Sequence, residues 1–195
     1  MNATINTAEA LAGGYLAMAQ VFSYPSPEVW QRLSESGLVD PDLSRETLEA
    51  EYLAAFEVGS NGKPVALFEG INRPECGRDG ILQELLRFYE YFDVLLNEND
   101  RDYPDHLVTE LEFVAWLCQQ EHAAEGKGGD AAPFRRATRD FLDRHLVVWL
   151  PEFQRKLEGT GTAYSEYGAA LADLVRQHRS QLNEEANRLE ASHES

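Results

Sequence analysis

The chain has 195 residues, of which 43% are hydrophobic and 26% charged, and its 34 acidic and 17 basic side chains give a formal net charge of −17 at pH 7. This balance is typical of a globular domain with its own core and excludes an intrinsically disordered chain. The acidic excess disfavours binding to nucleic acids and anionic membranes, and it favours basic partners such as an arginine-bearing peptide.

The sequence shows no pattern typical of a secreted or membrane-spanning protein. Its first ten residues, MNATINTAEA, have neither the basic region nor the apolar region of a signal peptide. No apolar run approaches the roughly 20 residues that a membrane helix needs. The two cysteines, Cys76 and Cys118, are too few for a disulfide framework or a Cys-x-x-Cys zinc site. We therefore expect a cytoplasmic protein without stable membrane insertion.

The N-terminal part is predicted to form helices separated by proline signals. Apolar side chains recur at helical spacing over 11–22, and Tyr24-Pro25 ends this helix because proline disfavours a helical residue before it. Ser26-Pro27 supplies the N-cap and first position of a second helix, and Asp40-Pro41 repeats that signal. Apolar residues at 48, 52 and 56 mark a further helix.

Residues 57–80 interrupt the helical pattern with many glycines and prolines, and an apolar patch, Val65-Ala66-Leu67-Phe68, lies in their middle. A loop of this length within a compact domain is often functional. Because the patch precedes an amphipathic helix over 81–98, we expect the two to offer an apolar surface to a partner's apolar segment.

The remaining segments are also helical in pattern. The next helix starts near 105 and runs to about His122, and a flexible linker separates it from a helix that begins at Phe134. Pro151 must kink or end that helix, and the last one starts at about Tyr164. The expected fold is all-α, a single helical-bundle domain over 1–188 with roughly seven to nine helices, followed by a disordered tail over 189–195.

No nucleotide-binding or catalytic motif is present. The sequence has no Gly-x-x-x-x-Gly-Lys-Ser/Thr loop, no Gly-x-Gly-x-x-Gly turn, and no His-Glu-x-x-His or Glu-x-x-His metal pair. Asp105-His106 is similar to the His-Asp pairs of some metal hydrolases, in reverse order, but the further ligands that a metal needs are not apparent. We expect no cofactor and no metal, and a metal-dependent enzyme is the weaker alternative.

The stretch DYPDHLVTELEFVAWLC, 102–118, combines acids and a histidine with a helix that is apolar nearly all round. Asp102 or Asp105 can cap this helix, with Pro104 in its first turn. Glu110 falls within the apolar sector, where an unpaired carboxylate is very costly.

Two interpretations of these acids stay open. Either an internal arginine such as Arg87 pairs with Glu110, or Asp105, His106 and neighbouring acids border a groove that receives an arginine from another molecule. His145 lies on the apolar face of a later helix and is expected to be a core histidine hydrogen-bonded to the backbone.

Four parts of the chain resemble a known family. They are YLAMAQVFSYP at 15–25, EYLAAFEVG at 51–59 with PVALFEG at 64–70, YPDHLVTELEFVAWL at 103–117 and FLDRHLVVWLPEF at 141–153. In this order they resemble the TorD/DmsD/NarJ family of cytoplasmic chaperones for molybdenum oxidoreductases. The resemblance is closest to the chaperones of dimethylsulfide-, ethylbenzene- and selenate/chlorate-type enzymes, and the Pro-Asp-His-Leu element is its most specific part.

The resemblance implies an all-helical, non-catalytic chaperone without a cofactor, acting as a monomer or homodimer. Such a chaperone binds the N-terminal leader, often a twin-arginine export signal, of a catalytic molybdopterin subunit and assists cofactor insertion and assembly before export. Family members bind leaders near the element that maps here onto Pro104, Asp105 and His106. The alternative is a helical adaptor that assembles proteins without contacting a leader.

We therefore predict a peptide-binding site in which the leader's apolar segment packs on aromatic side chains and its arginines face acids. Phe68 and the aromatic residues of 81–98 would receive the apolar segment, and His106 would order the pocket. The predicted site residues are Phe68, Tyr103, Pro104, Asp105, His106, Glu110 and Glu112.

Overall fold

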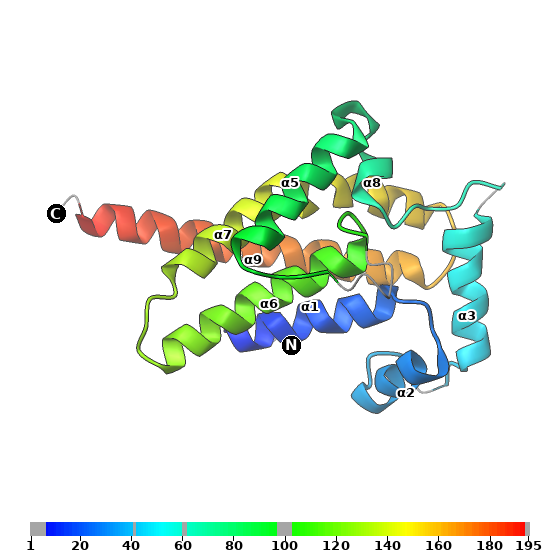
Figure 1. Cartoon of the computed structure of the whole chain (residues 1–195). Helices are drawn as coiled ribbons and strands as arrows, with labels where there is room; N and C mark the ends of the chain where they lie inside the picture. Colours follow the sequence, from blue (N-terminus) through cyan, green and yellow to red (C-terminus); the bar gives the residue numbers. More distant parts are fainter. Residues whose placement is uncertain (1–6, 41, 60–61, 97–102, 194–195) are drawn as a thin grey trace.

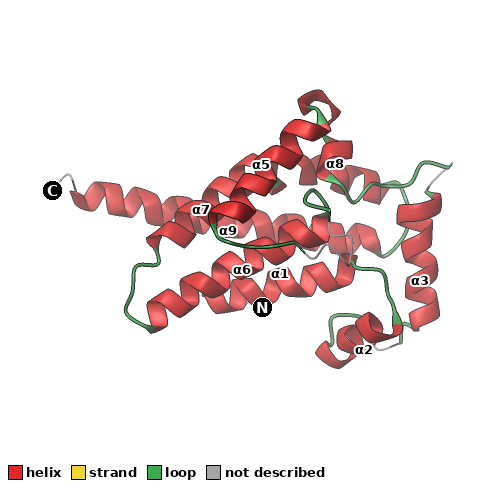
Figure 2. Cartoon of the chain, viewed as in Figure 1, coloured by secondary structure: helices red, strands yellow, loops and turns green. Residues whose placement is uncertain are grey.

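The computed structural model describes residues 7–40, 42–59, 62–96 and 103–193. Within these residues the chain forms nine α-helices and no strand, so the all-α class predicted from the sequence is confirmed (Figure 1, Figure 2). Among the described helices none is both long and apolar enough to cross a membrane.

The end of the first helix and the start of the second lie where the sequence predicts. Helix α1 (Ala8–Phe22) ends just before Tyr24-Pro25. Helix α2 (Pro27–Ser36) begins at a proline, which lacks only an N–H that has no partner in a first turn. The Ser26 hydroxyl caps α2 by accepting a hydrogen bond from the Val29 N–H at 3.3 Å.

The predicted start of the third helix at Asp40 is wrong. The Asp40 carboxylate instead accepts a hydrogen bond from the Asp42 N–H at 2.9 Å, which makes a turn. Helix α3 (Arg45–Leu53) begins five residues later, after Ser44, whose hydroxyl accepts from the Thr47 N–H. A short π-helical turn, Ala54–Val58, continues α3.

The segment predicted as a long loop contains a short helix, and the amphipathic helix after it is shorter than expected. Helix α4 (Glu69–Asn72) and a 3₁₀ turn precede α5 (Arg78–Tyr91). The predicted end of α5 at 98 is wrong, because Asp93 takes a left-handed conformation with φ 55°. Leu95, within the range predicted for this amphipathic helix, is 92% exposed beyond the end of the helix.

The C-terminal half consists of α6 (Leu107–Gly126), α7 (Ala132–Arg144), α8 (Leu146–Glu158) and α9 (Tyr164–His193). The chain turns between α7 and α8 at His145, with φ −117° and ψ −91°, so the break predicted at Pro151 is misplaced. Pro151 lies inside α8, where only one backbone hydrogen bond is lost to it.

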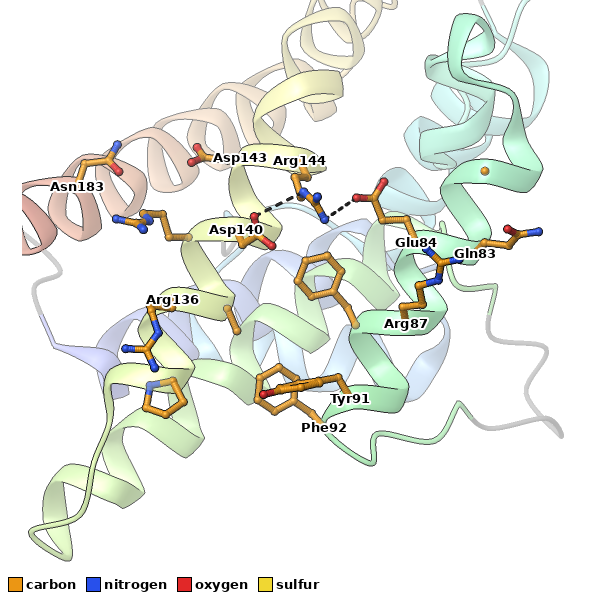
Figure 3. A pocket seen from close by; sticks show the side chains of 15 residues that line it. Gln83, Glu84, Arg87, Tyr91, Phe92, Arg136, Asp140, Asp143, Arg144 and Asn183 are labelled. Atoms are coloured by element: carbon orange, nitrogen blue, oxygen red, sulfur yellow. Dashed lines mark ion pairs between the residues drawn. The ribbon is translucent and has the colours of Figure 1, made fainter.

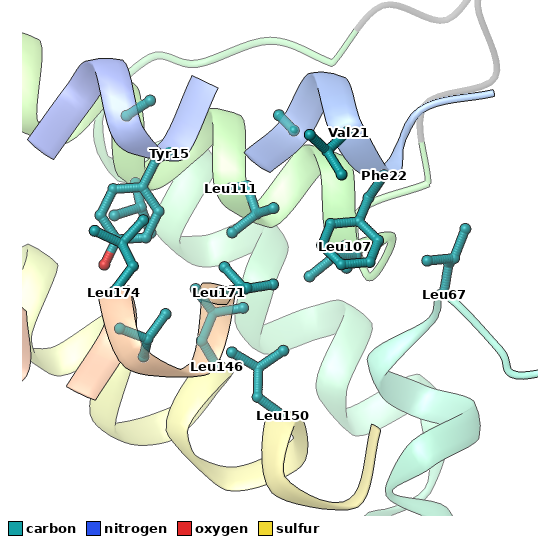
Figure 4. Packing of buried hydrophobic residues seen from close by; sticks show 14 of the residues in the cluster. Tyr15, Val21, Phe22, Leu67, Leu107, Leu111, Leu146, Leu150, Leu171 and Leu174 are labelled. Atoms are coloured by element: carbon teal, nitrogen blue, oxygen red, sulfur yellow. The ribbon is translucent and has the colours of Figure 1, made fainter. Parts of the chain in front are cut away.

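The core forms where α1, α6, α8 and α9 meet. Helices α1 and α6 pack along each other, and α9 packs against α1, α7 and α8 (Figure 1). Tyr15 and Phe22 of α1 and Leu107 and Leu111 of α6 meet leucines of α8 and α9 (Figure 4). Helix α6 is buried on both sides, as its apolar sequence predicts, so its first turn is rigidly placed at one end of this core.

Candidate functional site

Two segments that are distant in sequence meet at the start of α6. The Glu69 N–H donates to the Asp105 carbonyl, and the Leu107 N–H donates to the Leu67 carbonyl, both at 2.8 Å. These bonds form an antiparallel bridge between Phe68 and His106. The bridge fixes the Pro-Asp-His element against the segment that leads into α4.

Most of the apolar patch at 65–68 packs inward. Val65 is 3% exposed and Leu67 is 5% exposed, so their side chains belong to the core. The expectation that the whole patch offers an apolar surface is therefore wrong. Phe68 lies where the two bridged segments meet, a place that we call the crossing. It is the half-buried member of the patch that contributes a large ring to the surface.

Asp105 is fully buried and pairs with Arg78, the first residue of α5. The Arg78 Nε donates to Oδ2 and its Nη2 donates to Oδ1, each at 3.0 Å, which is the bidentate geometry that guanidinium and carboxylate groups favour. The Gly70 N–H adds a weaker contact to Oδ2 at 3.3 Å. The Arg78 side chain is 40% exposed, whereas that of Asp105 is 0% exposed. This ion pair therefore reaches solvent through the guanidinium alone.

Gly70 makes room for this ion pair. A Cβ atom at position 70 would lie 2.5 Å from the Cγ atom of Arg78 and 3.0 Å from Oδ2 of Asp105. Contact at 2.5 Å is shorter than carbon atoms allow, so any larger residue must displace the arginine. The absence of a side chain at Gly70 is thus part of how Arg78 and Asp105 are held together.

An aromatic cluster lies over the pair. The Phe68 ring contacts the Tyr103 ring edge-on at 5.6 Å and the His106 ring at 5.0 Å between centroids. The Arg78 guanidinium lies 5.3 Å from the Phe68 centroid, within cation–π range. Tyr103 is 49% exposed, so the cluster offers an aromatic surface beside a cation. We call Phe68, Tyr103 and His106 with Arg78 the aromatic surface.

His106, rather than Asp105, caps α6. Its Nδ1 accepts a hydrogen bond from the Val108 N–H at 3.2 Å, so Nδ1 is unprotonated in this arrangement. Pro104 lies before the helix instead of in its first turn, and its carbonyl accepts from the Tyr89 hydroxyl at 2.8 Å. The cap therefore lies one residue after Asp105, Pro104 precedes the helix, and Asp102 lies outside the described residues.

Beneath the bridge, Glu69 joins a buried polar network. One oxygen of its fully buried carboxylate contacts Nδ1 of His145 at 2.9 Å, and the other pairs with Arg73. His145 is a core histidine as predicted, but its partner is a carboxylate rather than the backbone. Arg73 also donates to the Arg144 carbonyl at 2.9 Å. The network connects α4 to the turn between α7 and α8.

Glu110 belongs to this interior and not to the surface. It is 0% exposed, and its Oε2 accepts a hydrogen bond from the Trp149 indole at 3.1 Å, while Oε1 has no partner among the described residues. Burial, followed by the nearby charge of Glu69, raises the pKa of Glu110 well above its usual value. The alternative of pairing with Arg87 is not realised, because the carboxyl group bonds Trp149 instead, and its raised pKa favours the neutral form.

The seven predicted site residues are thus only partly brought together. Phe68, Tyr103, Pro104, Asp105 and His106 lie at the crossing. Glu110 is sealed inside the core one turn further along α6, and Glu112 is exposed on that helix.

Sequence reasoning missed several residues that build the crossing. Arg78 and Gly70 lie in a segment that reads as an irregular loop, and Asp105 is 27 residues from Arg78. Glu69 and Trp149 lie in the family-like segments at 64–70 and 141–153, whose sequences do not reveal their contacts. The glycine-rich run at 70–80 was the available signal, because glycine is favoured where backbone and side chains approach closely.

The weaker alternative, a metal site at Asp105-His106, finds no support in the geometry. Both oxygens of Asp105 accept from Arg78, and Nδ1 of His106 accepts from the backbone. No group of three or more His, Cys, Asp or Glu side chains is placed to hold a metal ion within the part of the chain that the structure describes.

Comparison with known proteins gives a consistent result. Residues 21–155 match the family model described as nitrate reductase delta subunit. The chain is 69% identical to the selenate reductase assembly chaperone protein of Thauera selenatis, over 97% of this chain and 98% of that protein. It is 63% identical to the chlorate reductase assembly chaperone protein of Ideonella dechloratans, over 95% of this chain and 96% of that protein. A more distant relative is the chaperone protein TorD of Actinobacillus succinogenes, which is 28% identical over 44% of this chain and 38% of that protein.

Proposed function

Because the chain belongs to the TorD/DmsD/NarJ family of assembly chaperones, which are not enzymes, we propose that it matures the catalytic molybdopterin subunit of an oxidoreductase of the selenate or chlorate reductase type. The carrying observation is the 69% identity to a selenate reductase assembly chaperone across 97% of this chain. It would act in the cytoplasm, as a monomer or homodimer, before the client is exported.

The chaperone would recognise the N-terminal leader of its client at the aromatic surface. Phe68 and Tyr103 supply apolar rings that are half-buried or exposed, as a partner's apolar segment requires. The His106 ring packs against Phe68 and caps the start of α6, so it would order this surface rather than carry charge to the peptide.

The leader's arginines would compete with Arg78 for Asp105. Arg78 already makes the two contacts that a client arginine would seek, a bidentate bond to a carboxylate and a cation–π contact with Phe68. Its side chain is 40% exposed and follows a 3₁₀ turn and Gly77, so it can swing outward without disturbing a packed helix interior. Exchange of one guanidinium for another would leave the buried Asp105 neutralised throughout.

The acids play unequal parts in this proposal. Glu112 is exposed and can attract a cationic leader as it approaches. Glu110 would not contact the leader, because its carboxyl group is buried and bonded to Trp149. It would instead hold the start of α6 in place, and the Pro-Asp-His element directly precedes that start.

Calorimetric titration with the client's leader tests the proposal. The ligand is a synthetic peptide of the first residues of the catalytic subunit, about 30 in length, as an export leader requires. We expect binding that weakens in the Phe68→Ala variant and when lysines replace the two leader arginines, because lysine cannot bind a carboxylate bidentately. Tyr24→Ala, an exposed aromatic outside both the aromatic surface and the 81–98 segment, is the matched control.

Two outcomes would redirect the proposal. If the intact client binds but its leader peptide does not, the chain is a helical adaptor that recognises the folded subunit. If the leader binds equally well to wild type and Phe68→Ala, the chaperone role stands but the aromatic surface is not the leader site.

A further inference from the structure

A second surface feature lies between α5, α7 and the middle of α9. It is an open groove of about 990 Å³, and none of its lining residues belongs to the aromatic surface (Figure 3). Phe88, Phe92 and Ala137 form its apolar part, and Tyr91, which is 79% exposed, stands at its edge. An open groove of this volume leaves room for a short peptide segment.

The acidic side chains of this groove are neutralised. Arg144 pairs with Glu84 at 2.8 Å and with Asp140 at 3.5 Å. Dashed lines in Figure 3 mark the two ion pairs. Asp143 pairs with Arg179. Each of the three acids that line the groove therefore already faces a guanidinium group.

Three basic side chains of the groove are not neutralised. Arg87, Arg136 and Arg139 make no ion pair or hydrogen bond with any described residue. In a chain with twice as many acids as bases this is unusual, since among the other described arginines only Arg32 and Arg188 lack an ion pair with a described acid. The charge left over in the groove is positive, although the chain as a whole carries −17.

We propose that this groove is a docking site for an acidic segment of a partner protein, anchored by aliphatic or aromatic side chains. Its apolar part would receive the anchors, and Arg87, Arg136 and Arg139 would pair with carboxylates on either side of them. The same arginines repel the arginines of an export leader, so this segment is distinct from the leader. The proposal does not depend on the leader site.

The net negative charge of the chain affects the choice of binding experiment. Long-range repulsion between the acidic chain and an acidic peptide is screened beyond roughly 8 Å at physiological salt, whereas contacts within the groove are screened less. Added salt would thus reduce the long-range repulsion and also weaken the contacts within the groove. Reversal of individual charges separates these two effects, whereas a salt series does not.

The test uses fluorescence anisotropy with the full chain and a labelled peptide of alternating Glu-Glu and Leu-Phe pairs. The Arg136→Glu/Arg139→Glu variant should bind this peptide about tenfold or more weakly, because two attractive contacts become repulsive. Arg32→Glu, which reverses an unpaired arginine outside the groove, should change the affinity little. A peptide with Lys-Lys in place of Glu-Glu should bind the double variant better than it binds wild type.

Each remaining outcome overturns the proposal. The groove is no acidic-peptide site if the peptide fails to bind wild type, if Arg32→Glu weakens binding as much as the groove variant does, or if the lysine peptide prefers wild type. Arginine-dependent binding of inorganic pyrophosphate without binding of the peptide would reassign the groove to phosphate groups. Circular dichroism of the double variant, whose substituted side chains are not in the core, verifies that it is folded.

Discussion

The indole Nε1 of Trp149 donates a hydrogen bond to the Glu110 carboxyl group at 3.1 Å, which joins α8 to the first turn of α6 inside the core. Both side chains are essentially inaccessible, at 1% and 0% exposure. The bond satisfies the indole N–H, which would otherwise be buried without a partner. The raised pKa of this acid favours its neutral form, which can remain in the core while it accepts the indole bond.

Glu110→Gln should therefore change how stability depends on pH. The folded chain holds a proton on Glu110 that the unfolded chain loses above its ordinary pKa of 4.5, so the contribution of this group to the stability of the wild type falls as pH rises above about that value. Glutamine keeps an oxygen acceptor for Trp149 and does not titrate. Chemical denaturation at several pH values should show the variant gaining stability relative to wild type as pH increases.

The control for this prediction is Glu112→Gln, which makes the same change on the exposed side of α6. It should alter the pH dependence little. If the stability difference between Glu110→Gln and wild type is constant from acid to neutral pH, Glu110 is not held protonated in the fold.

Gly70→Ala should destabilise the crossing by about 1–3 kcal/mol, because overpacked sites must shift their neighbours. The added Cβ would lie 2.5 Å from the Cγ atom of Arg78 and 3.0 Å from an Asp105 oxygen. Gly13→Ala in α1 is the matched control: a Cβ there meets nothing within 4 Å, and alanine should stabilise the helix by roughly 0.5–1 kcal/mol. Urea unfolding curves compare the two, and equal effects would refute the packing argument.

The sequence correctly predicted features that depend on neighbouring residues, such as a helix cap. It missed features that depend on contacts between distant segments. Ser26-Pro27 placed the start of α2 correctly because cap and proline act within one turn. The end of α5 was misplaced because the apolar period continues to Leu95, although the chain turns away at Asp93. Helix ends of this kind depend on tertiary packing, which an apolar period does not encode.

The candidate site follows the same division. The sequence placed Asp105 and His106 at a helix start and Glu110 in an apolar sector, and both placements hold in outline. It did not pair Asp105 with Arg78, because that contact joins segments 27 residues apart through a tight approach at Gly70. An ion pair of this kind is visible only once the fold brings the partners together.

Arg78→Ala tests whether this arginine occupies the place of a client arginine. Removing it leaves the buried Asp105 without its cation, which should cost roughly 2 kcal/mol, since solvent already reaches the arginine side. Added leader peptide should then raise the melting temperature of the variant more than that of wild type, because its arginine restores the missing charge.

Two further variants make that prediction specific. Arg155→Ala removes an exposed arginine whose partner, Glu152, is also accessible, and it should respond to leader as the wild type does. Asp105→Asn removes the carboxylate and should abolish the extra stabilisation in the Arg78→Ala background. An equal temperature shift in wild type and Arg78→Ala would show that the leader does not replace Arg78.

His178 should make the chain sensitive to acid independently of Glu110. It is 1% exposed and lies 3.1 Å from the Tyr15 hydroxyl, and burial lowers the pKa of its ring from 6.5 to about 4. Below pH 6.5 this histidine binds a proton in the unfolded chain, whereas in the folded chain it does so only near pH 4. The contribution of His178 to stability is therefore lost as pH falls from about 6.5 to about 4. The full loss is roughly 3 kcal/mol.

The His178→Asn variant keeps a polar partner for Tyr15 but does not titrate, so its stability should fall less steeply across this pH range. His122→Asn, at an exposed position of α6, serves as control and should keep the wild-type slope. Guanidinium unfolding at pH 7 and pH 5 measures both. Equal slopes in the three proteins would mean that His178 accepts its proton inside the fold, which contradicts the strong desolvation expected at the contact between α1 and α9.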